Sequence, residues 1–142
     1  MIKIFITFLS YILIFFNTNL LSDENIDKIK IGLLAPFSGE YKYLGNSLLL
    51  STQLALSEIG DNKIVIIPRD SGSKNKNQLN KAITEIIKSG VKIIIGPVDS
   101  DHFEELAKYK DTIFISLSNK EPKIKENIVS IGISLDSQIS AL

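Results

Sequence analysis

The sequence predicts an α/β fold in which a parallel sheet carries helices on both faces. Short apolar runs alternate with longer segments of helical periodicity over residues 30–133. Three of the runs are β-branched and nearly continuous in apolar character, which is typical of strands that are buried on both faces. Strands that alternate with helices form parallel sheets through right-handed crossovers. The expected order is therefore β-α-β-α-β-α-β, followed by a loop and a last strand.

Five apolar runs are expected to form the strands. They are Lys30–Ala35, Lys63–Ile67, Val91–Ile95, Thr112–Ser116 and the weaker Ile128–Ile133. The first run stops at Pro36, the second at Pro68 and the third at Gly96-Pro97. Proline and glycine commonly interrupt regular structure, so the strands are predicted to end at these positions.

The segment Gln78–Ser89 is expected to be a helix with one apolar stripe. The stripe consists of Leu79, Ala82, Ile83, Ile86 and Ile87. Polar residues occupy the opposite side, as in a helix that packs one face on a sheet. A shorter helix is expected over Asp101–Tyr109, with acidic residues near its start, where the helix dipole favours them.

The helix expected over Leu44–Ile59 is apolar on more than one side. The stripe that we expect to be buried consists of Leu44, Leu48, Leu49, Ala55, Leu56 and Ile59. Leu50 and Leu54 fall on the other side of this helix. They indicate either a second contact surface or leucines that are merely exposed, and the sequence does not choose between the two.

Composition excludes several classes of protein. The 142 residues include 16 basic and 16 acidic side chains, which gives a net charge of 0. Because a nucleic-acid-binding protein normally carries a basic face, no nucleic acid is expected as a partner. The absence of cysteine excludes disulfides, thiolate metal sites and cysteine nucleophiles. With His102 as the single histidine, a multi-histidine zinc site is excluded and a Ser-His catalytic pair is not expected.

Residues 1–22 are predicted to be a secretory signal peptide. They contain one charged residue, Lys3, which is followed by an apolar run over Ile4–Phe16 and then by the more polar segment 17–22. The run is short for a membrane span, which needs about 20 apolar residues. Cleavage is expected after Ser22, but Leu20 fits the small-residue rule poorly, so an uncleaved inner-membrane anchor is the alternative. Residues 23–29 are then a linker to a domain outside the cytoplasm.

Polar and small residues follow the predicted strands, at the edge of the sheet where ligands bind in open parallel sheets. The candidate ligand-binding residues are Ser38, Gly39, Asp99, Ser100, Ser116, Ser118 and Asn119. Their hydroxyl and backbone N–H groups suit an anionic group. Each also has a local alternative, because the first pair could form only a turn, the second pair could cap a helix and the rest could be ordinary loop residues.

Four more residues near this edge have open roles. Asp70 is expected to be a turn or cap residue, and His102, in the first turn of a helix, is expected to be solvated. Tyr41 and Tyr43 could wall a cleft or pack on the loop that carries them. The sequence does not decide between these two roles of the tyrosines.

The sequence favours no enzyme. Gly32–Gly39 lacks the three closely spaced glycines of a dinucleotide-binding fingerprint, and no phosphate-binding Gly-Lys-Ser/Thr motif follows a strand. No pair of carboxylates is placed convincingly for acid–base chemistry. We therefore expect a non-catalytic protein with no cofactor and no metal.

Several segments resemble type I periplasmic solute-binding proteins of the leucine/isoleucine/valine-binding class. The opening residues that carry the resemblance are Ile31–Gly39, Tyr43–Leu50 and Gln53–Leu56. The subgroup that the chain resembles most is that of the alphaproteobacterial penicillin-binding protein activators, with matching segments at Leu33–Gly39, Leu44-Gly45, Gln53–Leu56, Pro68–Gly72 and Ile94–Pro97. The stretch Gly132–Gln138 is similar to a family motif, with Leu135 where a proline is usual.

The resemblance implies a flytrap protein with two α/β lobes, of which residues 30–142 are the N-terminal lobe, truncated before the second. In relatives that bind amino acids, first-lobe loops hold the α-carboxylate and α-amino groups of the ligand. The positions that match are Ser38, Ser100, and Ser116 or Ser118. Asp99 stands where relatives often have a small or apolar residue, and an acid there would repel a carboxylate.

Two functions agree with this resemblance. The first is a periplasmic solute-binding protein of the leucine-binding type, which takes a small amino-acid-like molecule and works with an ABC permease. The alternative is an activator-like module that regulates peptidoglycan synthesis through contacts with a cell-wall synthase. Membrane contact is expected only through the N-terminal segment. A lone lobe is expected to bind ligand weakly or not at all, because it lacks the opposite wall of the site.

Overall fold

The structure, a computed structural model, describes residues 28–120, 126–132 and 139–140. All five strands of its sheet are parallel and lie in the order β2-β1-β3-β4-β5. The strands are β1 (Ile29–Ala35), β2 (Ile64–Asp70), β3 (Ile93–Ile95), β4 (Ile113–Ser116) and β5 (Ile128–Ser130). The predicted parallel sheet is confirmed, while the predicted signal peptide lies outside the described residues.

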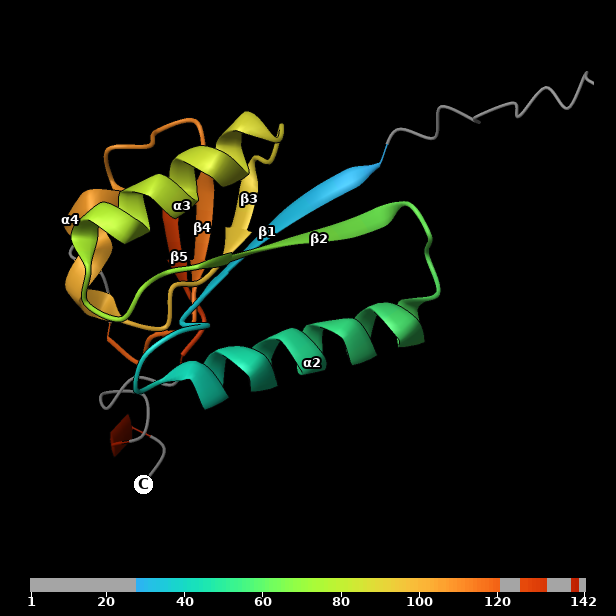
Figure 1. Ribbon diagram of the computed structural model, residues 1–142, viewed down its shortest axis with the longest axis horizontal. Coiled ribbons are helices and arrows are strands. Elements are labelled where there is room, and N and C mark those ends of the chain that lie inside the picture. The colour runs from blue at the N-terminus through green and yellow to red at the C-terminus, as the bar shows by residue number, and fades with distance from the viewer. Residues whose placement is uncertain (1–27, 121–125, 133–138, 141–142) are drawn as a thin grey trace, which may run out of the picture.

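The helices cover opposite faces of this sheet. They are α2 (Lys42–Ile59), α3 (Lys76–Lys88) and the short α4 (Phe103–Leu106), which follows a 3₁₀ turn over Ser100–His102. The chain passes from β1 to β2 on one side and then back across β1 to β3. Right-handed connections in opposite directions place α2 and α3 on opposite faces. Figure 1 shows α3 and α4 near one another, with α2 set apart below β1 and β2.

The hydrophobic core lies between the sheet and the helices α3 and α4. The strands contribute Leu34, Ile94, Phe114 and Ile128, and the helices contribute Leu79, Ala82, Ile83, Ile86, Phe103 and Leu106. The predicted stripe of α3 is confirmed, with Ile87 packed at its margin. Gly32 lets α3 approach the sheet closely, because a Cβ there would lie 2.7 Å from Cγ2 of Ile86.

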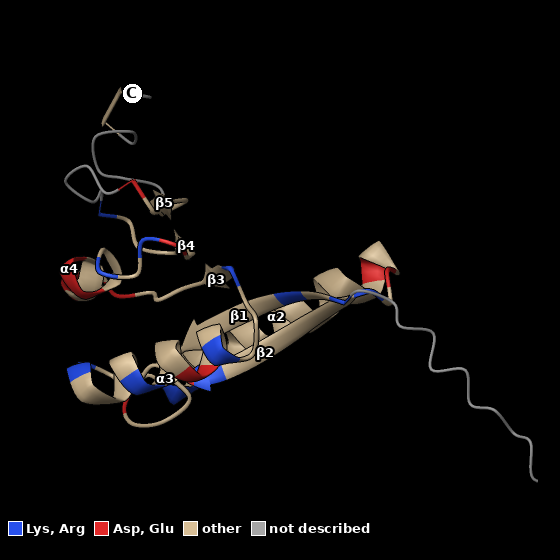
Figure 2. Ribbon diagram, turned by 90° about the horizontal axis from the view of Figure 1, so that it is seen from above, with Lys and Arg blue, Asp and Glu red and all other residues tan. Residues whose placement is uncertain are grey.

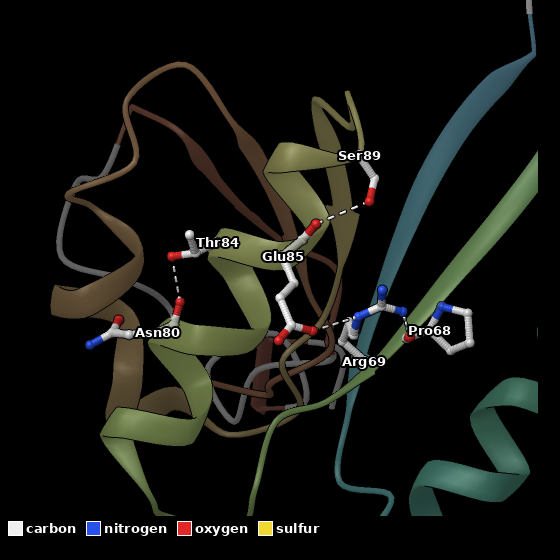
Figure 3. Close-up of polar contacts among 6 residues, drawn as sticks. All are labelled: Pro68, Arg69, Asn80, Thr84, Glu85 and Ser89. Carbon is white, nitrogen blue, oxygen red and sulfur yellow. Dashed lines mark hydrogen bonds and ion pairs between the residues drawn. The ribbon is translucent and has the colours of Figure 1, made fainter.

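Polar contacts also attach α3 to β2. The Arg69 Nε donates to Glu85 Oε2 at 2.9 Å, and the Arg69 Nη1 donates to the Pro68 carbonyl at 2.8 Å (Figure 3). Within α3, the Thr84 and Ser89 hydroxyls donate to carbonyls one turn earlier (Figure 3). The ion pair is partly exposed, so it contributes at most about 1 kcal/mol to stability.

The apolar stripe predicted for α2 is confirmed only in part. Leu48, Leu49 and Leu56 are half-buried, and Gly45 is the one fully buried residue of this helix. The other predicted members, Leu44, Ala55 and Ile59, are exposed, and so are Leu50 and Leu54 on the other side. Its contacts with the sheet are mainly with β1. Figure 2 shows that α2 is almost free of charged residues, whereas α3 carries several lysines. Among the described residues, no helix has the length and apolar character required to cross a membrane.

The expectation that the strands are buried on both faces is also wrong for part of the sheet. Ile93 and Ile113 are paired in register and are 38% and 48% exposed. Val129 of β5 pairs with Ile115 and is 52% exposed. These side chains point away from α3, and within the described residues α2 does not extend over them. We call Ile93, Ile113 and Val129 the open sheet face.

Pro68 does not end β2, contrary to the prediction. The strand continues to Asp70, and Pro68 pairs with Leu33 in the register. Because β2 is an edge strand, the missing N–H of a proline can face outward without breaking the ladder. The strand therefore delivers Asp70 to the carboxyl edge of the sheet.

The third helix is shorter than the predicted Asp101–Tyr109. Its regular part covers Phe103–Leu106, and the turns after it close by bonds from Lys108 N to Glu105 O and from Tyr109 N to Leu106 O. Such bonds between residues three apart tighten the end of a helix. At its start, the Asp99 carboxylate accepts from Asp101 N and favours the 3₁₀ turn.

Candidate functional site

The candidate site is a cavity at the carboxyl edge of β1 and β3. The connections that follow these neighbouring strands leave on opposite faces, so a crevice opens between them, as at the switch point of other open α/β sheets. The cavity has a volume of about 330 Å³, which suits a small molecule. It is lined by Pro36, Tyr41, Leu44, Ser71, Ser73, Lys74, Pro97, Val98, Asp99, Asp101, His102 and Lys120.

The wall of this cavity carries charges of both signs. Lys74 follows β2 and Lys120 follows β4, while Asp99 and Asp101 follow β3. Hydroxyl groups come from Ser71, Ser73 and Tyr41, and prolines, Leu44 and Val98 supply apolar surface. A balanced set of charges beside apolar surface suits a small molecule that itself carries both signs and an apolar part.

Asp70 holds the loop after β1 against the loop after β2. Its Oδ1 accepts from Phe37 N at 2.9 Å and from Gly72 N at 3.0 Å, and its Oδ2 accepts from Gln78 Nε2 at 2.7 Å. The expected turn role is confirmed by the bond from Gly72, and the bond from Phe37 adds a link between loops. The Ser73 hydroxyl strengthens this link by donating to the Ser38 carbonyl at 3.3 Å.

The hydrogen bonds to Asp70 determine its ionisation. Partial burial alone would raise the pKa of Asp70. The Ser38 side chain and the N–H groups of Gly72, Phe37 and Ser38 outweigh burial and lower the pKa below its ordinary value. The carboxylate is therefore charged at neutral pH.

The loops after β3 and β4 are joined through the Pro97 carbonyl. It accepts from the Ser116 hydroxyl at 3.3 Å and from Leu117 N at 3.3 Å. The Ser116 Oγ also accepts from Ser118 N, and the Ser118 Oγ accepts from Lys120 N. These buried hydroxyls shape the wall that carries Lys120, and a preformed wall reduces the entropy lost on binding.

The structure places the seven predicted ligand-binding residues along the same edge but brings only Asp99 into the cavity wall. Ser38 and Gly39 are exposed on the loop after β1, and Asn119 is exposed on the loop after β4. Ser100 begins the 3₁₀ turn, and Ser116 and Ser118 are buried in the contacts described above. Of the two tyrosines with open roles, Tyr41 lines the cavity and Tyr43 does not.

His102 is buried, contrary to the expectation that it is solvated. Its exposed fraction is 5%, and it lines the cavity. Both ring nitrogens are sealed from solvent, and neither has a hydrogen-bond partner within the part of the chain that the structure describes. The start of a helix usually faces water, but here the 3₁₀ turn directs His102 inward beside Phe103.

Sequence reasoning missed most of the cavity wall. Lys74 and Lys120 lie within polar loops, where charged residues are usually solvated, so composition gave no signal for them. One signal was present at Ser71 and Ser73. These serines follow β2 in the same way as the predicted ligand-binding serines follow β1, β3 and β4. Within the described residues, no cluster of histidine, aspartate and glutamate could hold a metal ion. The wall can bind by charge and hydrogen bonding.

Comparisons with known proteins agree with this geometry. The family model for periplasmic binding proteins matches residues 28–142. A solved structure of LpoA from Haemophilus influenzae has the same fold over 82% of this chain, with a TM-score of 0.60 and 21% sequence identity. The match covers 22% of the LpoA chain, so this chain spans about a fifth of that structure. No curated protein sequence matches the chain. The parallel sheet, its switch-point cavity and the family match together show that the chain belongs to the periplasmic binding protein family.

Proposed function

We propose that this chain is the first lobe of an extracytoplasmic solute-binding protein that takes a small amino-acid-like molecule. The observation that carries the proposal is the switch-point cavity, whose wall combines Lys74 and Lys120 with Asp99 and Asp101. An amino acid carries an ammonium, a carboxylate and a side chain, and this wall offers a counterpart to each. The family supports the proposal, since its members are named for periplasmic binding.

The charges suggest how such a ligand lies. Asp99 and Asp101 attract an ammonium group, and Lys74 and Lys120 attract a carboxylate. This orientation removes the difficulty that Asp99 would repel a carboxylate, because the carboxylate lies toward the lysines. The apolar part of the ligand then faces Leu44, Val98 and the prolines.

L-Leucine titrated into the isotope-labelled full-length chain tests the proposal by NMR. We expect saturable shifts at the backbone amides of the cavity wall, with a dissociation constant in the millimolar range, because one lobe supplies only one wall. Lys120→Gln is expected to weaken this binding, and Lys81→Gln on the exposed side of α3 is the matched control. Complete absence of shifts would contradict the proposal, and submicromolar affinity would contradict the need for a second wall.

A second candidate function is an activator-like module that regulates a cell-wall synthase by protein contact. The helix α2, which is nearly free of charged residues and exposes Leu50 and Leu54, favours it, because exposed apolar surface of this kind often marks an interaction site. The sequence resemblance to penicillin-binding protein activators and the fold shared with LpoA support the same candidate.

Binding of a purified penicillin-binding protein to the immobilised full-length chain tests this candidate. Leu50→Glu together with Leu54→Glu is expected to abolish binding without unfolding the chain, because both side chains are exposed. Thr84→Glu, on the exposed side of α3, is the matched control. Unchanged binding by the double variant would exclude α2 as the contact surface.

A further inference from the structure

His102 is the buried polar group at this site that the proposed ligand contacts do not use. It is the only histidine of the chain, and its exposed fraction is 5%. Neither ring nitrogen has a hydrogen-bond partner among the described residues. Buried polar groups in folded proteins are nearly always paired, and an unpaired one at a cavity often marks a functional position.

The cavity is where a partner for this ring can enter. His102 belongs to the cavity wall, between the loop that carries Asp99 and the first residues of α4. The next residue, Phe103, belongs to the apolar core and has no side-chain group that could pair with the ring. As the ring stands, both nitrogens are sealed from solvent, so a molecule in the cavity can reach one of them only after the side chain rotates toward the cavity.

The charges beside the ring determine the class of that molecule. Asp99 and Asp101 precede His102 closely in sequence and line the same cavity, so this end of the site attracts a cationic group. A neutral imidazole has one nitrogen that accepts a hydrogen bond, and an ammonium group donates up to three. An amine thus satisfies the ring and the carboxylates together, whereas a carboxylate would meet repulsion from both aspartates.

We infer that His102 is a specificity-determining residue whose imidazole accepts a hydrogen bond from the amine of the ligand. The inference rests on the proposed binding of an amino-acid-like molecule in this cavity. It adds a residue that distinguishes amines from otherwise similar molecules that lack the ammonium group. Loss of a bond to a charged donor is expected to weaken binding about tenfold.

NMR of the imidazole tests the inference directly, because a full-length chain without a histidine tag gives one set of ring ¹⁵N signals. L-Leucinamide, which keeps the ammonium and lacks the carboxylate, is the first probe. The second is 4-methylpentanamide, which has neither group. We expect L-leucinamide to shift the ring ¹⁵N signals saturably and 4-methylpentanamide to leave them unchanged.

Two variants provide the second measurement. His102→Leu fills similar space without a polar atom and is expected to bind L-leucinamide about tenfold more weakly than the native chain. His102→Gln keeps an acceptor and should retain part of the discrimination between the two probes. Backbone amide shifts of the cavity wall monitor binding in each case.

The outcomes separate this inference from the proposed function. If L-leucinamide moves the amides of the cavity wall but not the ring signals, His102 is not a contact and the inference fails while the proposed function stands. Equal affinity of His102→Leu and the native chain for L-leucinamide would also overturn it. If neither L-leucine nor L-leucinamide moves any amide of the wall, both the inference and the proposed function fail.

Discussion

At the scale of single residues, an unpaired buried imidazole should make the fold less stable than it could be. A buried polar group without a partner costs about 1–3 kcal/mol. His102→Leu removes both ring nitrogens and keeps a similar volume, so we expect it to raise the free energy of unfolding by about 1–2 kcal/mol. Urea unfolding of the full-length chain measures this. His102→Asn, which keeps a polar group, should give no increase in the free energy of unfolding. A lower free energy of unfolding for His102→Leu than for the native chain would show that the imidazole is already satisfied in the folded state.

Asp70 makes stability depend on pH in the acidic range. Its pKa is lowered in the folded chain, so its contribution is fully present above its unfolded pKa of about 4 and is lost as pH falls through the lower folded value. Asp70→Asn should therefore destabilise the chain at neutral pH, and the difference from the native chain should shrink at more acidic pH. Unfolding free energies measured across this range check it, with the exposed Asp111→Asn as control. A difference independent of pH would contradict the role of the charge.

The sequence allowed these residues to be placed but not their surroundings to be inferred. Asp70 was recognisable as a turn residue, yet its bond to Phe37 joins two loops that are distant in sequence. The burial of His102 depends on a 3₁₀ turn, which local propensity does not distinguish from the start of an α-helix. Tertiary geometry determined both outcomes.

At the scale of elements, Gly45 sets the position of α2 against the end of β1. A Cβ at this position would lie 2.1 Å from the Pro36 carbonyl oxygen. Alanine is normally better than glycine in a helix by about 1 kcal/mol. We nevertheless expect Gly45→Ala to destabilise the chain by about 1–3 kcal/mol, since the backbone contact cannot yield easily.

Thermal and urea unfolding measure this change, and Asn46→Ala is the matched control. Asn46 is the neighbouring helical position and is exposed, so alanine there should be neutral or slightly stabilising. If Gly45→Ala behaved like Asn46→Ala, α2 would not be held where the structure places it.

Periodicity predicted α3 well and α2 poorly for the same physical reason. A stripe of apolar residues identifies the buried side only when another layer covers it. Leu79, Ile83 and Ile86 of α3 are buried against the sheet, whereas α2 buries only Gly45 fully and leaves Leu50 and Leu54 exposed. Pro68 was misjudged because the sequence does not reveal which strand lies at the edge.

At the scale of the whole molecule, the open sheet face should promote self-association. Ile93, Ile113 and Val129 present adjacent apolar side chains to solvent on a parallel sheet, which is normally covered on both faces. We expect Ile113→Thr with Val129→Thr to reduce self-association of the full-length chain in sedimentation velocity experiments. Threonine suits strands, so the fold should be retained.

The control for this prediction is substitution on the covered face. Ile94→Thr places a hydroxyl in the core and should unfold the chain rather than change its assembly. Unchanged sedimentation of the double variant with intact circular dichroism would exclude the open sheet face as the cause of association.

The global architecture was predictable because alternation of strands and helices permits few topologies. The sequence also located the edge at which the cavity opens, since Asp99 lies in its wall. The remaining wall could not be inferred, because Lys74 and Lys120 come from loops on either side of the switch point and meet only once the strand order is known.

The contacts of Asp70 connect the loop after β1 to the start of α3. One carboxylate restrains Phe37 through one oxygen and Gln78 through the other, so displacement of the loop after β1 must be transmitted to the opening turn of α3. Anything that pushes on that loop will thus alter hydrogen exchange in a helix that lies on the opposite face of the sheet. Hydrogen exchange at the first turn of α3 can therefore report whether the cavity holds a ligand.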